Sequence, residues 1–128
     1  MAELGIRDNV MGPQPIAARK SLPPEMLELA KRVITMFMQG DSDGLASVSV
    51  TGVSGAPRAI AAQIPPETYT SHEVVATARV IHHYYLKVRM FGEGVEPFSI
   101  QFRLGKRNDQ WLLWEVINLT GRRGAWTP

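Results

Sequence analysis

The strongest pattern in the chain is a repeat of apolar residues at helical spacing that starts just after Pro23. The apolar positions fall at i, i+3, i+4 and i+7, as in a helix with one buried face. They are Met26, Leu29, Ala30, Val33, Ile34, Phe37 and Met38. Pro24 has a φ suited to a first turn, and Gly40 is a typical residue just beyond a helix end. The pattern predicts an amphipathic helix that ends before Gly40.

The middle of the chain has no sustained period. Residues 41–44 have turn chemistry, and the short alternating stretch 45–50 fits either a strand or a second short helix. Residues 51–57 are rich in Gly, Ser and Pro and are expected to form a loop. Pro65 and Pro66 end any helix or strand that the residues before them form. We therefore assign no secondary structure to residues 58–70.

From Ser71 the apolar positions recur at every second residue, as in a strand with one buried side. The apolar side holds Val74, Ala76, Ala78, Val80, His82, Tyr84, Leu86, Val88 and Met90. The other side is mixed and is expected to be partly in contact with water. The alternation predicts one long strand over residues 71–90, with a bend or bulge that curves the sheet.

Two further strands follow along the chain. Residues 98–104 alternate after a turn at 91–94, and residues 105–109 form a hairpin that leads into a strand at 111–119. This last strand is apolar on both faces. Burial on both faces follows if a helix covers one face and a second subunit covers the other, so a homodimer is expected.

Length and composition fit one folded domain. At 128 residues, two domains would each be too small for a comfortable core, and the hydrophobic fraction of 45% is an ordinary globular value. We expect a flexible arm over residues 1–23, a domain over residues 24–120 and a tail over residues 121–128. One helix followed by a run of strands places the domain in the α+β class.

Charge and cysteine content narrow the classes of function. The net charge is only +2 and the basic residues are spread along the chain, so nucleic-acid binding through Lys106–Arg107 and Arg122–Arg123 is the weakest hypothesis. The absence of cysteine excludes disulfides, thiolate catalysis and cysteine-based zinc sites. The sequence shows neither a signal peptide nor an apolar stretch near 18 residues. This predicts a cytoplasmic protein that does not span a membrane, provided that Met1 is the native start.

The order of elements resembles a known superfamily. Phe37-Met-Gln-Gly-Asp41 is similar to the end of the first helix in the NTF2-like superfamily, and residues 98–104 with Asn108-Asp-Gln-Trp111 are similar to its closing strands. This superfamily is named for nuclear transport factor 2 and also contains ketosteroid isomerase and the polyketide cyclases. The resemblance covers roughly residues 24–120. It implies a cystatin-like cone, in which an N-terminal amphipathic helix packs on a curved antiparallel sheet, and this fold does not determine function.

The resemblance also implies a pocket between the helix and the concave face of the sheet. Its lining residues here would be Phe37, Val80, His82, Tyr84 and Phe102. Isomerase members need a tyrosine and acids in an apolar pocket, and the inward stripe of the helix carries neither. The Asp-Arg-Asp set of the epoxide-hydrolase members is not recognisable either. The domain is therefore expected to be non-catalytic, to use no cofactor or metal, and to bind a small apolar ligand or a protein partner.

Three residues are candidates for acid–base chemistry if the pocket is catalytic. His82 and Tyr84 lie two positions apart on one face of the predicted strand, about 7 Å from each other, where they could act as a base and an oxyanion donor. The alternative for this pair is a hydrogen-bonded core histidine beside an aromatic ring. Glu115 is a candidate if it faces inward, and otherwise it pairs with an arginine on a neighbouring strand. The alternative function is therefore an isomerase, dehydratase or cyclase.

The C-terminal tail is a candidate site for a partner. Arg122, Arg123 and Trp126 follow the last strand, and arginine and tryptophan are enriched at binding hot spots. A tail that packs back onto the core is the alternative, and the sequence leaves both open.

Overall fold

The computed structural model describes residues 22–53 and 55–120, and the predicted amphipathic helix is present as α1 (Pro24–Met38). Its buried residues are Met26, Leu27, Leu29, Ala30, Val33, Ile34 and Phe37. Beyond the helix, Gly40 has a φ of 65° and its amide donates to the carbonyl of Phe37 at 3.1 Å, while the amide of Asp41 donates to the carbonyl of Met36 at 2.8 Å. These two bonds form a Schellman motif, which confirms Gly40 as the residue that ends the helix.

Two short helices, α2 (Ser42–Ser47) and α3 (Gly55–Ala61), occupy the middle of the chain. In the stretch 45–50 the chain is helical through Ser47, because the Asp41 carboxylate caps α2 by accepting from the amide of Gly44 at 2.9 Å. The loop predicted for residues 51–57 is wrong from Gly55 onward. There the chain enters α3, which buries Pro57, Ile60 and Ala61 and so gains a hydrophobic face that a surface loop would lack.

The sheet has four antiparallel strands in the order β1-β2-β3-β4. They are β1 (Ser71–Val80), β2 (His83–Phe91), β3 (Phe98–Arg107) and β4 (Gln110–Asn118). The prediction of one long strand over residues 71–90 is wrong, because the chain reverses at Ile81 and His82 and the two halves pair with each other as β1 and β2. The two-residue turn, across which Val80 pairs with His83, shifts the alternation by one position, and the bulge in β1 shifts it back. The apolar residues therefore stay at even positions near both ends of the segment, which is why alternation alone did not reveal the turn.

The predicted bulge is present in β1, and it changes which side chains face the core. Val74 pairs with Val88 and Ala76 pairs with Lys87, so Val75 is an extra residue in the strand. Beyond this bulge the odd positions of β1 share a face with Tyr84 and the even positions share the opposite face. The predicted apolar side of residues 71–90 is therefore correct in β2 and reversed in the second half of β1.

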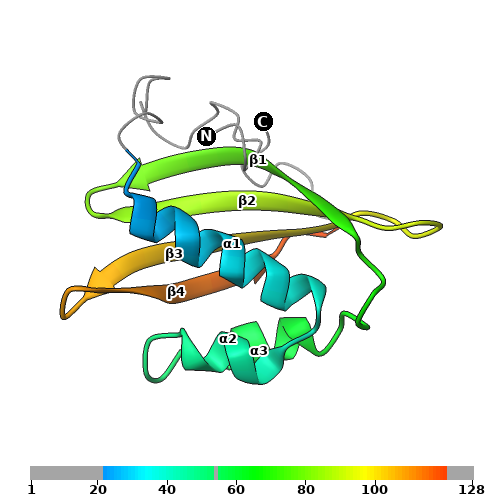
Figure 1. Ribbon diagram of the computed structural model, residues 1–128, viewed down its shortest axis with the longest axis horizontal. Helices are drawn as coiled ribbons and strands as arrows, with labels where there is room; N and C mark the ends of the chain where they lie inside the picture. Colours follow the sequence, from blue (N-terminus) through cyan, green and yellow to red (C-terminus); the bar gives the residue numbers. More distant parts are fainter. Residues whose placement is uncertain (1–21, 54, 121–128) are drawn as a thin grey trace.

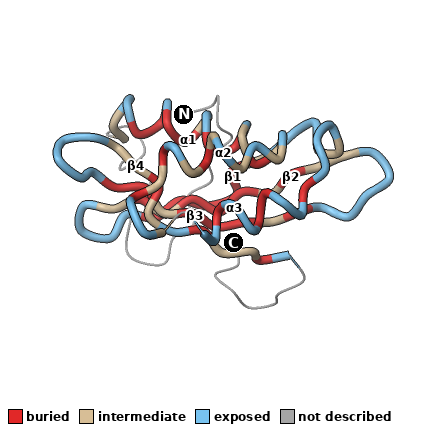
Figure 2. Tube along the Cα trace, turned by 90° about the horizontal axis from the view of Figure 1, so that it is seen from below, coloured by how far each residue is buried: buried red, intermediate tan, exposed pale blue. Residues whose placement is uncertain are grey.

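The core lies between α1 and one face of the sheet. Figure 1 shows α1 crossing the sheet, with α2 and α3 beyond the β4 side, and Figure 2 shows the buried residues gathered between the helix and the strands. The largest fully buried side chains include Phe37 from α1, Leu86 from β2 and Phe102 from β3. This arrangement confirms the α+β class and the helix packed on an antiparallel sheet. In the described part of the chain, no helix combines the length and apolarity needed to cross a membrane.

The face of the sheet opposite α1 carries a cluster of aromatic and charged side chains. The Arg103 guanidinium lies 5.9 Å from the ring centres of both Tyr85 and Trp114, and its Nε is 3.9 Å from Oε1 of Glu115. The His83 ring lies 4.9 Å from the Trp114 ring. Burial, then the positive charges of Arg103 and His82, lower the pKa of His83 below its ordinary value. The folded protein therefore favours neutral His83.

Replacing Gly40 by alanine should destabilise the fold more than the same change at Gly94. Both glycines have a positive φ, of 65° and 73°, but a Cβ on Gly40 would lie 2.5 Å from the backbone oxygen of Ile64, whereas one on Gly94 would meet open space. The strained φ alone costs about 1–2 kcal/mol in each variant. We expect Gly40→Ala to cost clearly more than this in urea unfolding, and equal costs would show that the contact with Ile64 is unimportant.

Thermal stability should fall on acidification partly because of His83. A histidine whose folded pKa is lowered binds fewer protons in the folded state than in the unfolded chain, so stability is lost as pH drops from above 6.5 through the folded pKa. We expect the fall in Tm between pH 7.5 and 5.5 to be smaller in His83→Gln than in the wild type. Burial also lowers the pKa of His72. The same melts on His72→Gln therefore show how much of the pH dependence comes from that second histidine. An unchanged pH dependence in His83→Gln would contradict this assignment.

Candidate functional site

A hollow of about 450 Å³ lies at the end of the sheet where α1 begins. The start of α1, the β1–β2 turn and the β3–β4 hairpin all lie at this end (Figure 1). Seven of the described residues line the hollow, namely Pro23, Arg79, Ile81, His82, Tyr84, Lys106 and Trp111. We call this hollow the hairpin pocket, because six of its seven residues come from the two hairpins.

Strand register brings these side chains together. Tyr84 pairs with Arg79 in β1 and with Leu104 in β3, so all three lie on the face that carries α1. Lys106 pairs with Trp111 two positions further along β3, which puts them on the same face. A second bulge, in which Trp114 is the extra residue of β4, sets this register.

Two aromatic rings form the wall of the hairpin pocket. The rings of Tyr84 and Trp111 lie 5.9 Å apart at an angle of 57°. This geometry is that of a favourable aromatic pair. Tyr84 is buried and Trp111 is half-buried. The indole Nε1 of Trp111 is itself buried and has no hydrogen-bond partner in the described part of the chain. The wall is therefore apolar but includes one unsatisfied donor.

The rim of the hairpin pocket is basic. Arg79, His82 and Lys106 contribute to it, and none of the seven lining residues is acidic. The Lys106 ammonium lies 5.6 Å from the centre of the Trp111 ring and 3.5 Å from Oδ1 of Asp109. Both members of that ion pair are more than half exposed, so it contributes little and holds Lys106 only weakly.

The turn at the pocket mouth is strained. Ile81 has a φ of 58° and is 80% exposed. A β-branched residue in this region of backbone space is an outlier, and such outliers are concentrated at functional sites. Nothing in the packing of the described residues calls for an exposed isoleucine there.

Of the five residues that the resemblance named for a pocket between helix and sheet, the structure brings two together at the hairpin pocket. His82 and Tyr84 both line the hairpin pocket, although His82 belongs to the β1–β2 turn and not to a continuous strand with Tyr84. Phe37 and Phe102 are fully buried in the core and line neither described pocket. Val80 pairs with His83 and is 44% exposed, because the bulge at Val75 moves it to the opposite face of the sheet.

The remaining predicted residues lie elsewhere. Glu115 is exposed, pairs with Arg103 on the face opposite α1, and is therefore not among the groups of the hairpin pocket. Arg122, Arg123 and Trp126 lie outside the described residues. Within the described residues, no group of three or more His, Cys, Asp or Glu side chains is placed to hold a metal ion.

Sequence reasoning missed Pro23, Arg79, Ile81, Lys106 and Trp111. Trp111 and Lys106 could have been found, since both flank the predicted hairpin at residues 105–109 and point the same way once that hairpin is closed. Arg79 could not, because its face depends on the bulge at Val75.

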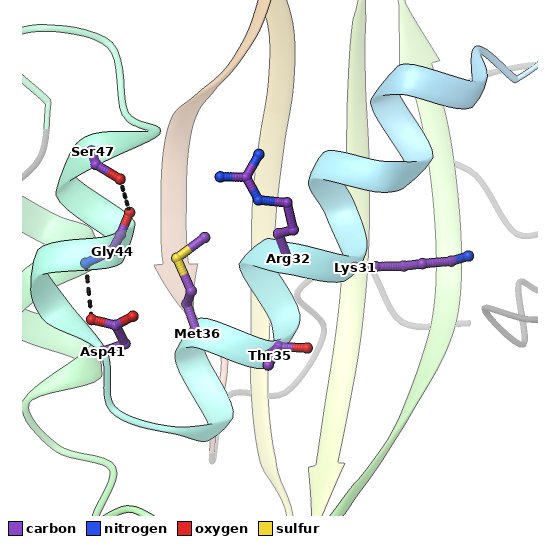
Figure 3. A pocket seen from close by; sticks show the side chains of 7 residues that line it. All are labelled: Lys31, Arg32, Thr35, Met36, Asp41, Gly44 and Ser47. Atoms are coloured by element: carbon purple, nitrogen blue, oxygen red, sulfur yellow. Dashed lines mark hydrogen bonds between the residues drawn. The ribbon is translucent and has the colours of Figure 1, made fainter.

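A second hollow, of about 430 Å³, lies between α1 and α2, and we call it the helix groove (Figure 3). It is more open to solvent than the hairpin pocket. Its polar groups are largely used in local structure: Asp41 accepts from the amide of Gly44, and the Ser47 hydroxyl donates to the carbonyl of Gly44 at 2.6 Å. Figure 3 shows Lys31 pointing away from α2. The helix groove therefore offers few free polar groups that converge on a ligand.

Comparisons with known proteins support the fold. No protein-family model matches the sequence, and no curated protein matches it at a significant level. The structure is similar to the crystal structure of a "Putative NTF2-like transpeptidase" from Campylobacter jejuni, with a TM-score of 0.58 and 14% sequence identity. The match covers 70% of this chain and 96% of that chain. Together with the helix-on-sheet architecture, this likeness shows that the chain has the NTF2-like fold, as its sequence resemblance implied.

Proposed function

We propose that the chain is a non-catalytic binding protein that holds a small, largely apolar molecule in the hairpin pocket. The observation that carries this proposal is the wall formed by Tyr84 and Trp111, which presents aromatic surface inside a hollow large enough for a two-ring compound. Apolar walls with a few polar groups at the edge are typical of small-molecule sites. The strained turn at Ile81, at the mouth of the same hollow, also supports this location.

The kinds of polar side chain found at the hairpin pocket favour binding over turnover. Among the described residues no carboxylate lines the hairpin pocket, so the acid pair that isomerase members use has no counterpart among them. Covalent transfer, which the name of the Campylobacter jejuni protein suggests for that protein, needs a nucleophile. In the part of the chain that the structure describes, no serine, threonine or cysteine lines the hairpin pocket. We therefore do not extend that activity to this chain.

An acid–base enzyme is the second candidate, because His82 and Tyr84 do line one hollow. His82 would act as the base and Tyr84 as the donor to an oxyanion. The two proposals differ in what binding leads to: a binding protein returns its ligand unchanged, whereas an isomerase, dehydratase or cyclase converts it. His82→Ala would abolish turnover in an enzyme while leaving affinity for an apolar ligand nearly unchanged.

Binding of a protein partner, or of a second copy of this chain, is a part of the proposal that does not involve the hairpin pocket. Leu112, Trp114 and Ile117 of β4 are half-buried on the face opposite α1, in keeping with the two-sided strand from which a homodimer was predicted. Homodimerisation, contact with a protein partner through the tail, and a cytoplasmic location stay predictions.

Binding of 2-naphthamide, a neutral two-ring probe, tests the proposed site. We expect its addition to shift the Trp111 indole N–H signal in ¹H–¹⁵N spectra, with the largest backbone shifts at residues 79–84 and 106–111. Trp111→Ala should weaken binding about tenfold, since losing an aromatic contact costs on the order of 1.4 kcal/mol.

Trp114→Ala is the matched control, because Trp114 lies half-buried on the same strand but belongs to the opposite face. It should leave the affinity for 2-naphthamide unchanged. The thermal melt of each variant shows whether it is folded. Equal affinity in the two folded variants, or no binding to the wild type at all, would contradict the proposed site.

A further inference from the structure

The hairpin pocket combines an aromatic wall with basic side chains, and none of its described lining residues is acidic. From these features we infer that its ligand is an organic anion, a carboxylate carried on an aromatic or other apolar body. This inference rests on the proposed function and adds to it the chemical class of the ligand.

Arg79 is the main anion-binding group in this inference. It lies on the α1 side of β1, next to Tyr84 across the strand pair, and its side chain is exposed. Within residues 22–53 and 55–120 it forms no ion pair. A guanidinium group binds a carboxylate with two parallel hydrogen bonds, and one that is not already paired can do so without losing an existing partner.

Lys106 supplies a second charge from the facing hairpin. Its ion pair with Asp109 is exposed and 3.5 Å long, so exchange of Asp109 for a ligand carboxylate has a small cost. The position of its ammonium beside the Trp111 ring places positive charge next to the aromatic wall. A ligand with an aromatic body and a carboxylate would thus contact both groups at once.

The start of α1 adds to the positive potential on the same side. Pro23 is the N-cap residue and lines the hairpin pocket, and it gives the helix no side-chain cap. The N-terminal end of a 15-residue helix carries a partial positive charge, part of which Glu25 in the first turn offsets. The buried, unpartnered Nε1 of Trp111 is a further donor in a lining residue. These two features support a site that the basic side chains already define, and neither would define one alone.

The rest of the described residues offer no equal alternative site for an anion. The helix groove includes Lys31 and Arg32 but also Asp41, and it has no aromatic wall. Arg103 on the opposite face is already engaged by Glu115 and by two aromatic rings. The hairpin pocket is therefore the hollow in the described part of the chain in which a basic rim, with Arg79 outside any ion pair among the described residues, meets aromatic surface.

Three probes of one shape test the charge preference: 2-naphthoate is an anion, 2-naphthamide is neutral and 2-naphthylmethylamine is a cation. We expect 2-naphthoate to bind the wild-type protein at least tenfold more tightly than 2-naphthamide by isothermal titration calorimetry. The amine should bind more weakly than both. The advantage of the anion should shrink as NaCl is raised, because exposed charges are screened by salt.

Arg79→Gln tests the residue assignment, and Arg103→Gln is its matched control on the opposite face. Arg79 is exposed and unpaired among the described residues, so Arg79→Gln should fold normally and lose most of the preference for 2-naphthoate over 2-naphthamide. Lys106→Gln should lose part of the preference, and Arg103→Gln should lose none.

The outcomes distinguish failure of this inference from failure of the proposed function on which it rests. Equal affinity of the wild type for 2-naphthoate and 2-naphthamide would overturn the anion preference and leave the binding site intact. Loss of preference in Arg103→Gln but not in Arg79→Gln would overturn the residue assignment. Failure of all three probes to bind would overturn the proposed function as well.

Discussion

Burial of the apolar face of α1 against one side of the sheet is the interaction on which the rest of the structure depends. Phe37 and Phe102, from opposite sides of that interface, are both fully buried. Truncating one such side chain typically costs about 3–5 kcal/mol, a large part of the roughly 5–15 kcal/mol by which a domain is stable. Because α1 must lie over the strands to bury this face, its N-terminal end lies at the end of the sheet that carries the β1–β2 and β3–β4 turns (Figure 1). The hairpin pocket is a consequence of that placement.

Two bulges then decide which side chains enter the pocket. The extra residue Val75 puts Arg79 on the α1 side of β1, and the extra residue Trp114 gives β4 the register that pairs Lys106 with Trp111. Without the first bulge, the register of Ser71–Val74 would continue, so Ala78 would pair with Tyr84 in place of Arg79 and the rim would lose a charge. Irregular strands are thus what gives a common fold a pocket of particular chemistry.

The same irregularities mark the limit of what the sequence could predict. The α1 helix could be predicted from its apolar repeat and Gly40, and the last two strands from their alternation, since these signals are local. Tyr84 was placed on the correct face because β2 is regular. The turn at Ile81 and His82 could not be predicted, as it has no glycine, asparagine or aspartate and lies within continuous alternation. Residue Arg79 could not be placed on its face either, because sequence periodicity does not show a one-residue bulge.

A crystal structure of the protein with 2-naphthoate is the most direct test of the central claim, that the hairpin pocket is a ligand site with a basic rim. The account predicts the naphthalene ring against Tyr84 and Trp111, with the carboxylate at roughly 2.7–3.2 Å from the guanidinium nitrogens of Arg79. A probe bound in the helix groove, or one in the hairpin pocket with its carboxylate turned away from Arg79 and Lys106, would contradict it.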